Sequence, residues 1–138
     1  MGKIINGNPV VPGRAHGQVI AAGEPISFWG GYDHLTGEIT DRRHPLSGLN
    51  ASGKILAVPF SRGSSTTTAV LLEAVRCGTA PAAIITTGVD SFFALASIVA
   101  GQMYQCSLPI VAVTTAEFGQ LKSGLAIAIK KNGEIHFQ

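Results

Sequence analysis

An apolar run meets a helical pattern, through a turn of small hydroxyl residues, in the stretch Lys54-Ile55-Leu56-Ala57-Val58-Pro59-Phe60-Ser61-Arg62-Gly63-Ser64-Ser65-Thr66-Thr67-Thr68. Residues 55–58 are typical of a buried strand, and residues 65–77 have the length and composition of a helix that ends before Gly78. The turn therefore places hydroxyl groups at a helix N-terminus. Backbone N–H groups and the helix dipole favour negative charge there, on a bound anion or on a deprotonated side chain.

Downstream of this stretch, strand and helix patterns alternate. Residues 82–86 and 109–113 are apolar runs of the strand type. Between them, Asp90 or Ser91 can cap an apolar helix that runs through Val99. The order strand, helix, strand, helix, strand predicts an α/β fold with a largely parallel sheet.

The two flanks of this unit add further β-structure. Thr115 can cap a short helical turn, and residues 125–129 and 134–137 predict a hairpin around Asn132-Gly133. The first third of the chain is rich in Gly and Pro, which predicts short strands and turns, with a polar excursion over residues 33–48. We expect this third to contribute a β-layer or a small barrel.

Length and composition narrow the class of protein. The 138 residues are most simply one domain over 1–138, with 46% hydrophobic and only 13% charged residues, against roughly 25% charged in an average soluble domain. A partner covering part of the surface would explain this, and so would a compact domain whose 17 glycines make tight turns. The net charge of +2 includes no basic run, so nucleic acid is not an expected partner.

Neither an export signal nor a membrane span is expected from the sequence, which predicts a cytoplasmic protein without membrane association. Cys77 and Cys106 are far apart and follow no CxxC spacing, and the four histidines are dispersed. We therefore expect no metal site in this chain, which on its own cannot ligate an iron–sulfur cluster.

The hydroxyl turn can be compared with known catalytic motifs. A P-loop requires a second glycine and a lysine that are missing, and a hydrolase elbow requires Gly-x-Ser-x-Gly. A serine can act as a general base in a dry, electropositive setting, such as a helix N-terminus near Arg62. From spacing alone, however, ordinary N-capping by Ser64 or Ser65 is the favoured interpretation, because every helix needs a cap and catalytic serines are rare.

Residues 54–66 closely resemble the signature of the aconitase X small subunit, and the resemblance continues over residues 27–33, 36–39, 41–48 and 80–85. It implies a swivelling β/β/α domain like the mobile C-terminal domain of aconitase. It also implies a large-subunit partner that holds the iron–sulfur cluster, or iron, and most substrate contacts. The resulting heteromer would act as a hydro-lyase on a small hydroxy acid.

Carried over from that resemblance, the catalytic base is Ser64. Arg62, Gly63, Ser65 and Thr66 are the implied substrate-binding residues. Thr66-Thr67 stand where aconitase itself has Arg-Glu, so the tricarboxylate-binding arginine is missing and citrate is not the expected substrate.

Similar enzymes dehydrate cis-3-hydroxy-L-proline or (R)-mevalonate 5-phosphate. The 27–48 segment, and the absence of an obvious phosphate-gripping Lys/Arg cluster in the sequence, favour dehydration of cis-3-hydroxy-L-proline to Δ1-pyrroline-2-carboxylate. Two rivals stay open: a non-catalytic assembly or regulatory subunit, and a serine hydrolase that uses a histidine such as His44.

Overall fold

The computed structural model describes residues 3–62 and 65–138. Ten strands are assigned in it: β1 (Ile4–Asn6), β2 (Asn8–Val11), β3 (Ala15–Ala21), β4 (Ile26–Ser27), β5 (Ile55–Ala57), β6 (Ser61–Arg62), β7 (Ala83–Thr87), β8 (Ile110–Val113), β9 (Ala126–Ile129) and β10 (Glu134–Phe137). Three helices are assigned: α1 (Ser65–Cys77), α2 (Ser91–Tyr104) and α3 (Thr115–Phe118). None of the helices in the described residues has the length and apolar character needed to cross a bilayer.

Eight strands form one mixed sheet in the order β1-β10-β9-β3-β5-β7-β8-β2. The central strands β3, β5, β7 and β8 are parallel, whereas β1, β10, β9 and β2 join antiparallel. The α/β class predicted from the sequence is confirmed. The sheet is less parallel than expected, because the first and last segments of the chain join it in antiparallel pairs. The same segments bend over the parallel strands, so the predicted contribution of a β-layer or small barrel agrees with the structure.

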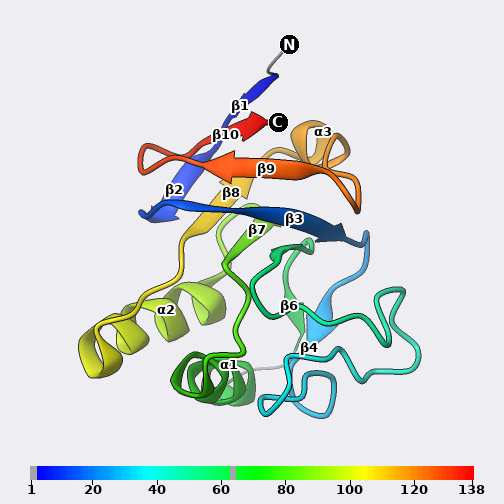
Figure 1. Ribbon diagram of the computed structural model, residues 1–138, viewed down its shortest axis with the longest axis vertical. Helices are drawn as coiled ribbons and strands as arrows, with labels where there is room; N and C mark the ends of the chain where they lie inside the picture. The colour runs from blue at the N-terminus through cyan, green and yellow to red at the C-terminus, as the bar shows by residue number, and fades with distance from the viewer. Residues whose placement is uncertain (1–2, 63–64) are drawn as a thin grey trace.

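The two end strands of the sheet are consecutive in the chain, which nearly closes the sheet. β1 and β2 are separated only by Gly7, whose N–H donates to the Gly133 carbonyl (3.1 Å) in the turn between β9 and β10. A Cβ on Gly7 would lie 2.9 Å from that oxygen, so only glycine fits without a shift. Figure 1 shows β1, β10 and β9 lying across one side of the parallel strands, with α1 and α2 on the other.

Alternation along the central strands separates two hydrophobic clusters. Leu56 and Ile84 point into the cluster that contains helix residues, and Ile55 and Ile85 point into the cluster under β1, β9 and β10. Successive side chains of a strand face opposite sides, so strands buried on both faces are apolar throughout. This explains why β5, β7 and β8 are continuous apolar runs in the sequence.

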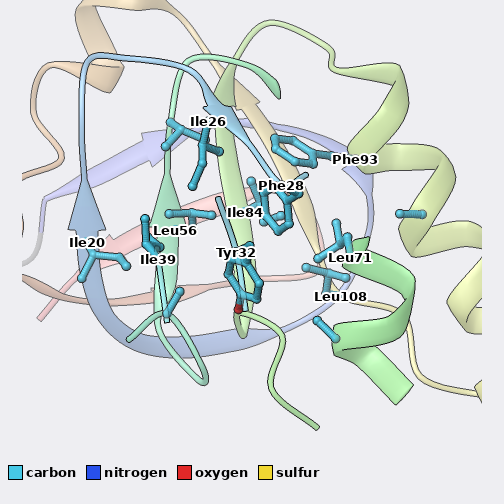
Figure 2. Close-up of a cluster of buried hydrophobic side chains, with 14 of the residues drawn as sticks. Ile20, Ile26, Phe28, Tyr32, Ile39, Leu56, Leu71, Ile84, Phe93 and Leu108 are labelled. Carbon is cyan, nitrogen blue, oxygen red and sulfur yellow. The ribbon is translucent and has the colours of Figure 1, made fainter. Parts of the chain in front are cut away.

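Side chains from the long segment between β4 and β5 also belong to the helix-side cluster (Figure 2). Phe28 lies fully buried in it, stacked on Tyr32 (4.7 Å between ring centroids) and edge-on to Phe93 of α2 (5.6 Å). The Tyr32 hydroxyl donates to the Thr79 carbonyl (2.7 Å), just after α1. The polar excursion predicted over residues 33–48 is therefore anchored by Phe28 and Tyr32, which precede it, and by its own buried side chains Ile39 and Leu46 in the same cluster.

Most predicted elements are confirmed, including the helix over residues 65–77, the cap at Asp90 and the C-terminal hairpin. Gly78 follows α1 with a φ of +76°, as expected of a residue that ends a helix. The predicted cap at Thr115 was wrong by one residue. Thr114 caps α3, because its hydroxyl and the Glu117 side chain form a reciprocal capping box.

Candidate functional site

The candidate site lies at the C-terminal edge of the parallel strands. β5 leads through Pro59 and Phe60 into β6 and the hydroxyl turn, and β7 leads into Asp90 at the start of α2. Because parallel strands end at the same edge, these two connections are neighbours, and the N-termini of α1 and α2 lie beside each other. In open α/β sheets this edge is where ligands usually bind.

Asp90 joins the two connections. Its Oδ1 accepts hydrogen bonds from the N–H groups of Phe92 and Phe93 (both 3.0 Å), which caps α2. Its Oδ2 accepts from the Ser61 N–H (2.6 Å) and the Ser61 hydroxyl (2.8 Å). The side chain is buried, and these four hydrogen bonds offset the cost of removing a carboxylate from water. The strand that enters the hydroxyl turn is thereby fixed to the second helix.

Further contacts hold both ends of the turn. Ser27 of β4 pairs with Arg62 of β6 in parallel register. On the helix side, the buried Thr67 hydroxyl donates to the Arg62 carbonyl (3.3 Å), and the Thr68 hydroxyl donates to the Phe92 carbonyl of α2 (3.3 Å). The later residues of the hydroxyl run therefore have a structural role, because Thr67 and Thr68 connect α1 to β6 and α2.

The predicted site residues fall in different parts of the structure. Arg62 is exposed at the end of β6, Ser65 begins α1, and the exposed Thr66 follows it. Gly63 and Ser64 lie outside the described residues. The structure thus describes the two sides that flank Ser64, and the roles assigned to it remain predictions.

Arg62 also lines a polar pocket of about 450 Å³ beside the turn. Its other walls are Glu24 and Pro25, which follow β3, and residues 41–44 of the long excursion. The sequence showed no obvious phosphate-gripping Lys/Arg cluster. The pocket nevertheless brings Arg62 together with Arg42 and Arg43, which are about twenty residues away in the chain. The adjacent arginine pair was the signal that could have indicated it.

His44 fixes the position of this excursion and is not oriented to serve a serine. Its Nδ1 accepts from the Leu46 N–H (3.1 Å), so Nε2 carries the proton and donates to the Glu24 carbonyl (3.2 Å). With a buried ring and both nitrogens engaged by the backbone, His44 lacks the open acceptor that a hydrolase base requires. The serine hydrolase alternative therefore lacks the histidine that was proposed to activate its serine.

A slightly larger pocket, of about 510 Å³, lies at the opposite edge of the sheet. Arg14 and His16, at the start of β3, and Lys130, after β9, are among its lining residues. The parallel strands begin at this edge, so the pocket is remote from the hydroxyl turn and from Asp90. We base the candidate site on the smaller pocket because only that one adjoins the turn.

The part of the chain that the structure describes contains no group of three or more His, Cys, Asp or Glu side chains that could hold a metal ion. The residues present therefore do not fit an iron–sulfur cluster, and any such group would need ligands from another chain or domain. What residues 3–62 and 65–138 do offer at the site is a fixed turn, a buried carboxylate and a set of guanidinium groups.

Comparison with known proteins identifies the family. Residues 4–137 match the aconitase X swivel domain family, so the chain belongs to it. A crystal structure of Thermococcus kodakaraensis aconitase X in its holo-form superimposes with a TM-score of 0.87 at 29% identity, covering 99% of this chain and 98% of that one. The predicted β/β/α swivel-domain fold is confirmed.

Two groups of relatives carry different names. The chain is 46% identical over 101 residues, 73% of its length, to a cis-3-hydroxy-L-proline dehydratase of Pseudomonas aeruginosa, and spans 17% of that protein. It is 34% identical over 132 residues, 95% of its length, to the phosphomevalonate dehydratase small subunit of Pyrococcus furiosus, and spans 92% of that protein. The chain thus spans about a fifth or less of the hydroxyproline dehydratases it matches and nearly all of that small subunit.

Proposed function

We propose that this chain is the swivel-domain subunit of an aconitase X type hydro-lyase that dehydrates cis-3-hydroxy-L-proline to Δ1-pyrroline-2-carboxylate. The single observation that supports this choice of substrate is the 46% identity to a cis-3-hydroxy-L-proline dehydratase. The identity to the phosphomevalonate dehydratase small subunits is 30–39%. The active site would be completed by a large subunit, which would also hold the iron–sulfur cluster.

In this proposal Ser64 is the general base. It removes the proton from the substrate carbon next to the carboxylate, the hydroxyl group on the neighbouring carbon leaves as water, and the resulting cyclic enamine tautomerises to the product imine. Support comes from the surroundings of the turn. Asp90 fixes Ser61, three residues before Ser64 in the sequence, and α1 begins with the residue after Ser64. The N-terminus of a helix favours negative charge.

Arg62, Gly63, Ser65 and Thr66 would contact the substrate or support the turn. Arg62 adjoins both the turn and the polar pocket, which suits a residue that orients a carboxylate. A guanidinium close to Ser64 would also favour the ionised form of its hydroxyl.

Dehydration of (R)-mevalonate 5-phosphate is the second candidate. It is favoured by the similarity to phosphomevalonate dehydratase small subunits over 95% of the chain. The arginine-lined pocket is also compatible with a phosphate group. The two candidates share the fold and the role of Ser64 and differ in the substrate group that is recognised.

The proposal is tested by producing the chain together with an aconitase X large subunit and measuring turnover of both substrates and bound iron. We expect turnover of cis-3-hydroxy-L-proline. Ser64→Ala should lower kcat by at least about a thousandfold with assembly and iron content unchanged, because no other base replaces it. Ser107→Ala, an exposed serine after α2, is the matched control and should keep full activity.

Other results would contradict specific parts of the proposal. If the complex turns over mevalonate 5-phosphate alone, that compound is the substrate and cis-3-hydroxy-L-proline is not. Near-normal activity of Ser64→Ala would show that Ser64 is not the base. A complex that assembles with iron but turns over neither compound would favour the assembly or regulatory role.

A further inference from the structure

Three arginines from two distant segments line the polar pocket beside the hydroxyl turn. Arg62 is the last residue of β6, and Arg42 and Arg43 are adjacent in the long excursion between β4 and β5. All three side chains are exposed, so their guanidinium groups are open to a ligand. Arginine recognises carboxylate and phosphate groups through paired hydrogen bonds, which makes such a grouping suited to an oxyanion.

The backbone that carries Arg42 and Arg43 is rigidly held. The His44 N–H donates to the Asp41 carbonyl (3.0 Å), which closes a four-residue turn with the two arginines at its centre. The Arg43 N–H donates to Asp41 Oδ1 (3.0 Å), and the buried His44 ring anchors the end of the turn to Glu24. Such fixed placement lowers the entropy cost of holding a ligand between the arginines.

The charges around the pocket favour an anion. Within residues 3–62 and 65–138, the ion pairs are Arg76 with Glu73 and, when protonated, His136 with Glu134, so none of the three pocket arginines is neutralised by a paired carboxylate. Asp41 and Glu24 also line the pocket, but one Asp41 oxygen is already engaged by the backbone of the turn. Three guanidinium groups outnumber these two carboxylates.

We infer that Arg42 and Arg43, together with Arg62, form a binding site for an oxyanion group of the substrate, either a carboxylate or a phosphate. This inference rests on the proposed function for the identity of the ligand as a substrate, but the pocket and its charge do not depend on it. The three arginines would hold the anionic group beside Arg62, the last residue of β6, which precedes Ser64 by two residues in the sequence. Arg42 and Arg43 thereby become substrate-binding residues, a role that the sequence motif had not assigned to them.

The first test measures steady-state kinetics of the complex with its large subunit. Arg42→Gln and Arg43→Gln should each raise KM about tenfold or more for the accepted substrate, with a smaller change in kcat, because each removes a charged hydrogen bond to the bound group. Arg14→Gln is the matched control, since Arg14 is an exposed arginine at the opposite edge of the sheet. If both pocket variants behave like Arg14→Gln, the inference is overturned.

The second test does not require activity. The full chain, labelled with ¹⁵N, is titrated with sodium acetate and separately with sodium phosphate, and the arginine Nε–Hε signals are followed by NMR. We expect saturable shifts of Arg42, Arg43 and Arg62 at roughly 10 mM anion, and none of Arg14.

Saturation by acetate would identify a carboxylate site, and saturation by phosphate alone a phosphate site. An absence of saturable shifts with both anions would overturn the inference even if the complex is an active dehydratase. Saturable shifts together with a complex that is inactive on both compounds would support the anion site and contradict the proposed function instead. Saturation with unchanged KM in the pocket variants of an active complex would indicate an adventitious ion only, and would overturn the substrate role.

Discussion

Asp90 is the residue on which the geometry of the site depends most directly. One carboxylate oxygen caps α2 and the other receives both donors of Ser61. A buried carboxylate with this many donors connects a helix start to a neighbouring loop in a way that neutral side chains cannot reproduce. If Ser64 is the base, as proposed above, the influence of Asp90 on it would be indirect, through β6, and Asp90 would act as a positioning residue.

Asp90→Asn should destabilise the chain by about 1–3 kcal/mol, because the amide nitrogen cannot accept the hydrogen bonds that one of the two oxygens receives. Ser61→Ala removes only the hydroxyl bond and should cost about 1 kcal/mol. Urea unfolding of both variants measures the difference. Equal costs would show that the Ser61 backbone bond contributes little.

Tyr32 links stability to alkaline pH. Burial raises the pKa of the Tyr32 hydroxyl well above its ordinary range, so the unfolded chain loses this proton before the folded chain does. The stabilisation by neutral Tyr32 is therefore complete below about pH 10 and decreases above it, by up to about 1.4 kcal/mol per pH unit. Tyr32→Phe should lack this part of the decline in stability at alkaline pH. At neutral pH the variant should be less stable by about 1 kcal/mol, because it lacks the hydrogen bond to Thr79.

The measurement is the free energy of unfolding in urea at about pH 9 and about pH 11 for both chains. The wild-type chain should lose more stability over this interval than Tyr32→Phe. The same loss in both would mean that other groups cause the alkaline decline.

At the scale of elements, α2 shows how far the sequence could be interpreted. The helix and its cap at Asp90 were predictable from a capping residue followed by a long run of helix formers. Which face of the helix is buried could not be predicted, because none of residues 91–104 is charged and apolar side chains occur on all sides of the helix. Packing against α1 and β8 selects the face that is buried, with Phe93, Ala96, Ser97 and Ala100 inside. Ser97 is tolerated there because its hydroxyl bonds both polar groups of the Leu108 backbone.

Two large residues on this one helix should therefore respond differently to truncation. Phe93→Ala removes a fully buried ring that packs edge-on against Phe28 and should cost about 3–5 kcal/mol. Leu95→Ala, on a side chain that is 50% exposed, should change stability by no more than about 0.5 kcal/mol. Thermal or urea unfolding compares them, and similar costs would mean that the assigned face of α2 is wrong.

At the scale of the whole molecule, the contacts between segments that are distant in the chain could not be predicted from the sequence. Strand runs predicted the parallel core, but which strands would flank it depends on pairings between the two ends of the chain. The arginine pocket escaped prediction for the same reason, because Arg42, Arg43 and Arg62 meet only after the excursion folds back onto β6. The resemblance to a family, by contrast, correctly indicated the swivel-domain fold.

Closure of the sheet can be tested at the turn that meets Gly7. Gly133 has a φ of +93°, and a Cβ there would lie only 2.4 Å from the Gly7 carbonyl oxygen. Gly133→Ala should therefore cost clearly more than Gly124→Ala, which shares a positive φ (+96°) but has nothing within 4 Å of its Cβ position. We expect about 1 kcal/mol for Gly124→Ala and at least about 2 kcal/mol for Gly133→Ala, measured by urea unfolding. Equal costs would show that this contact does not constrain closure.

The near-closed sheet has a further consequence for the tendency of this chain to self-associate. Open sheet margins offer unpaired N–H and C=O groups to other molecules, and long flat margins promote self-association. Here the two marginal strands, β1 and β2, have three and four residues and are successive pieces of one bent segment. So little unpaired backbone leaves few sites for strand addition, which should limit strand-mediated aggregation of the chain.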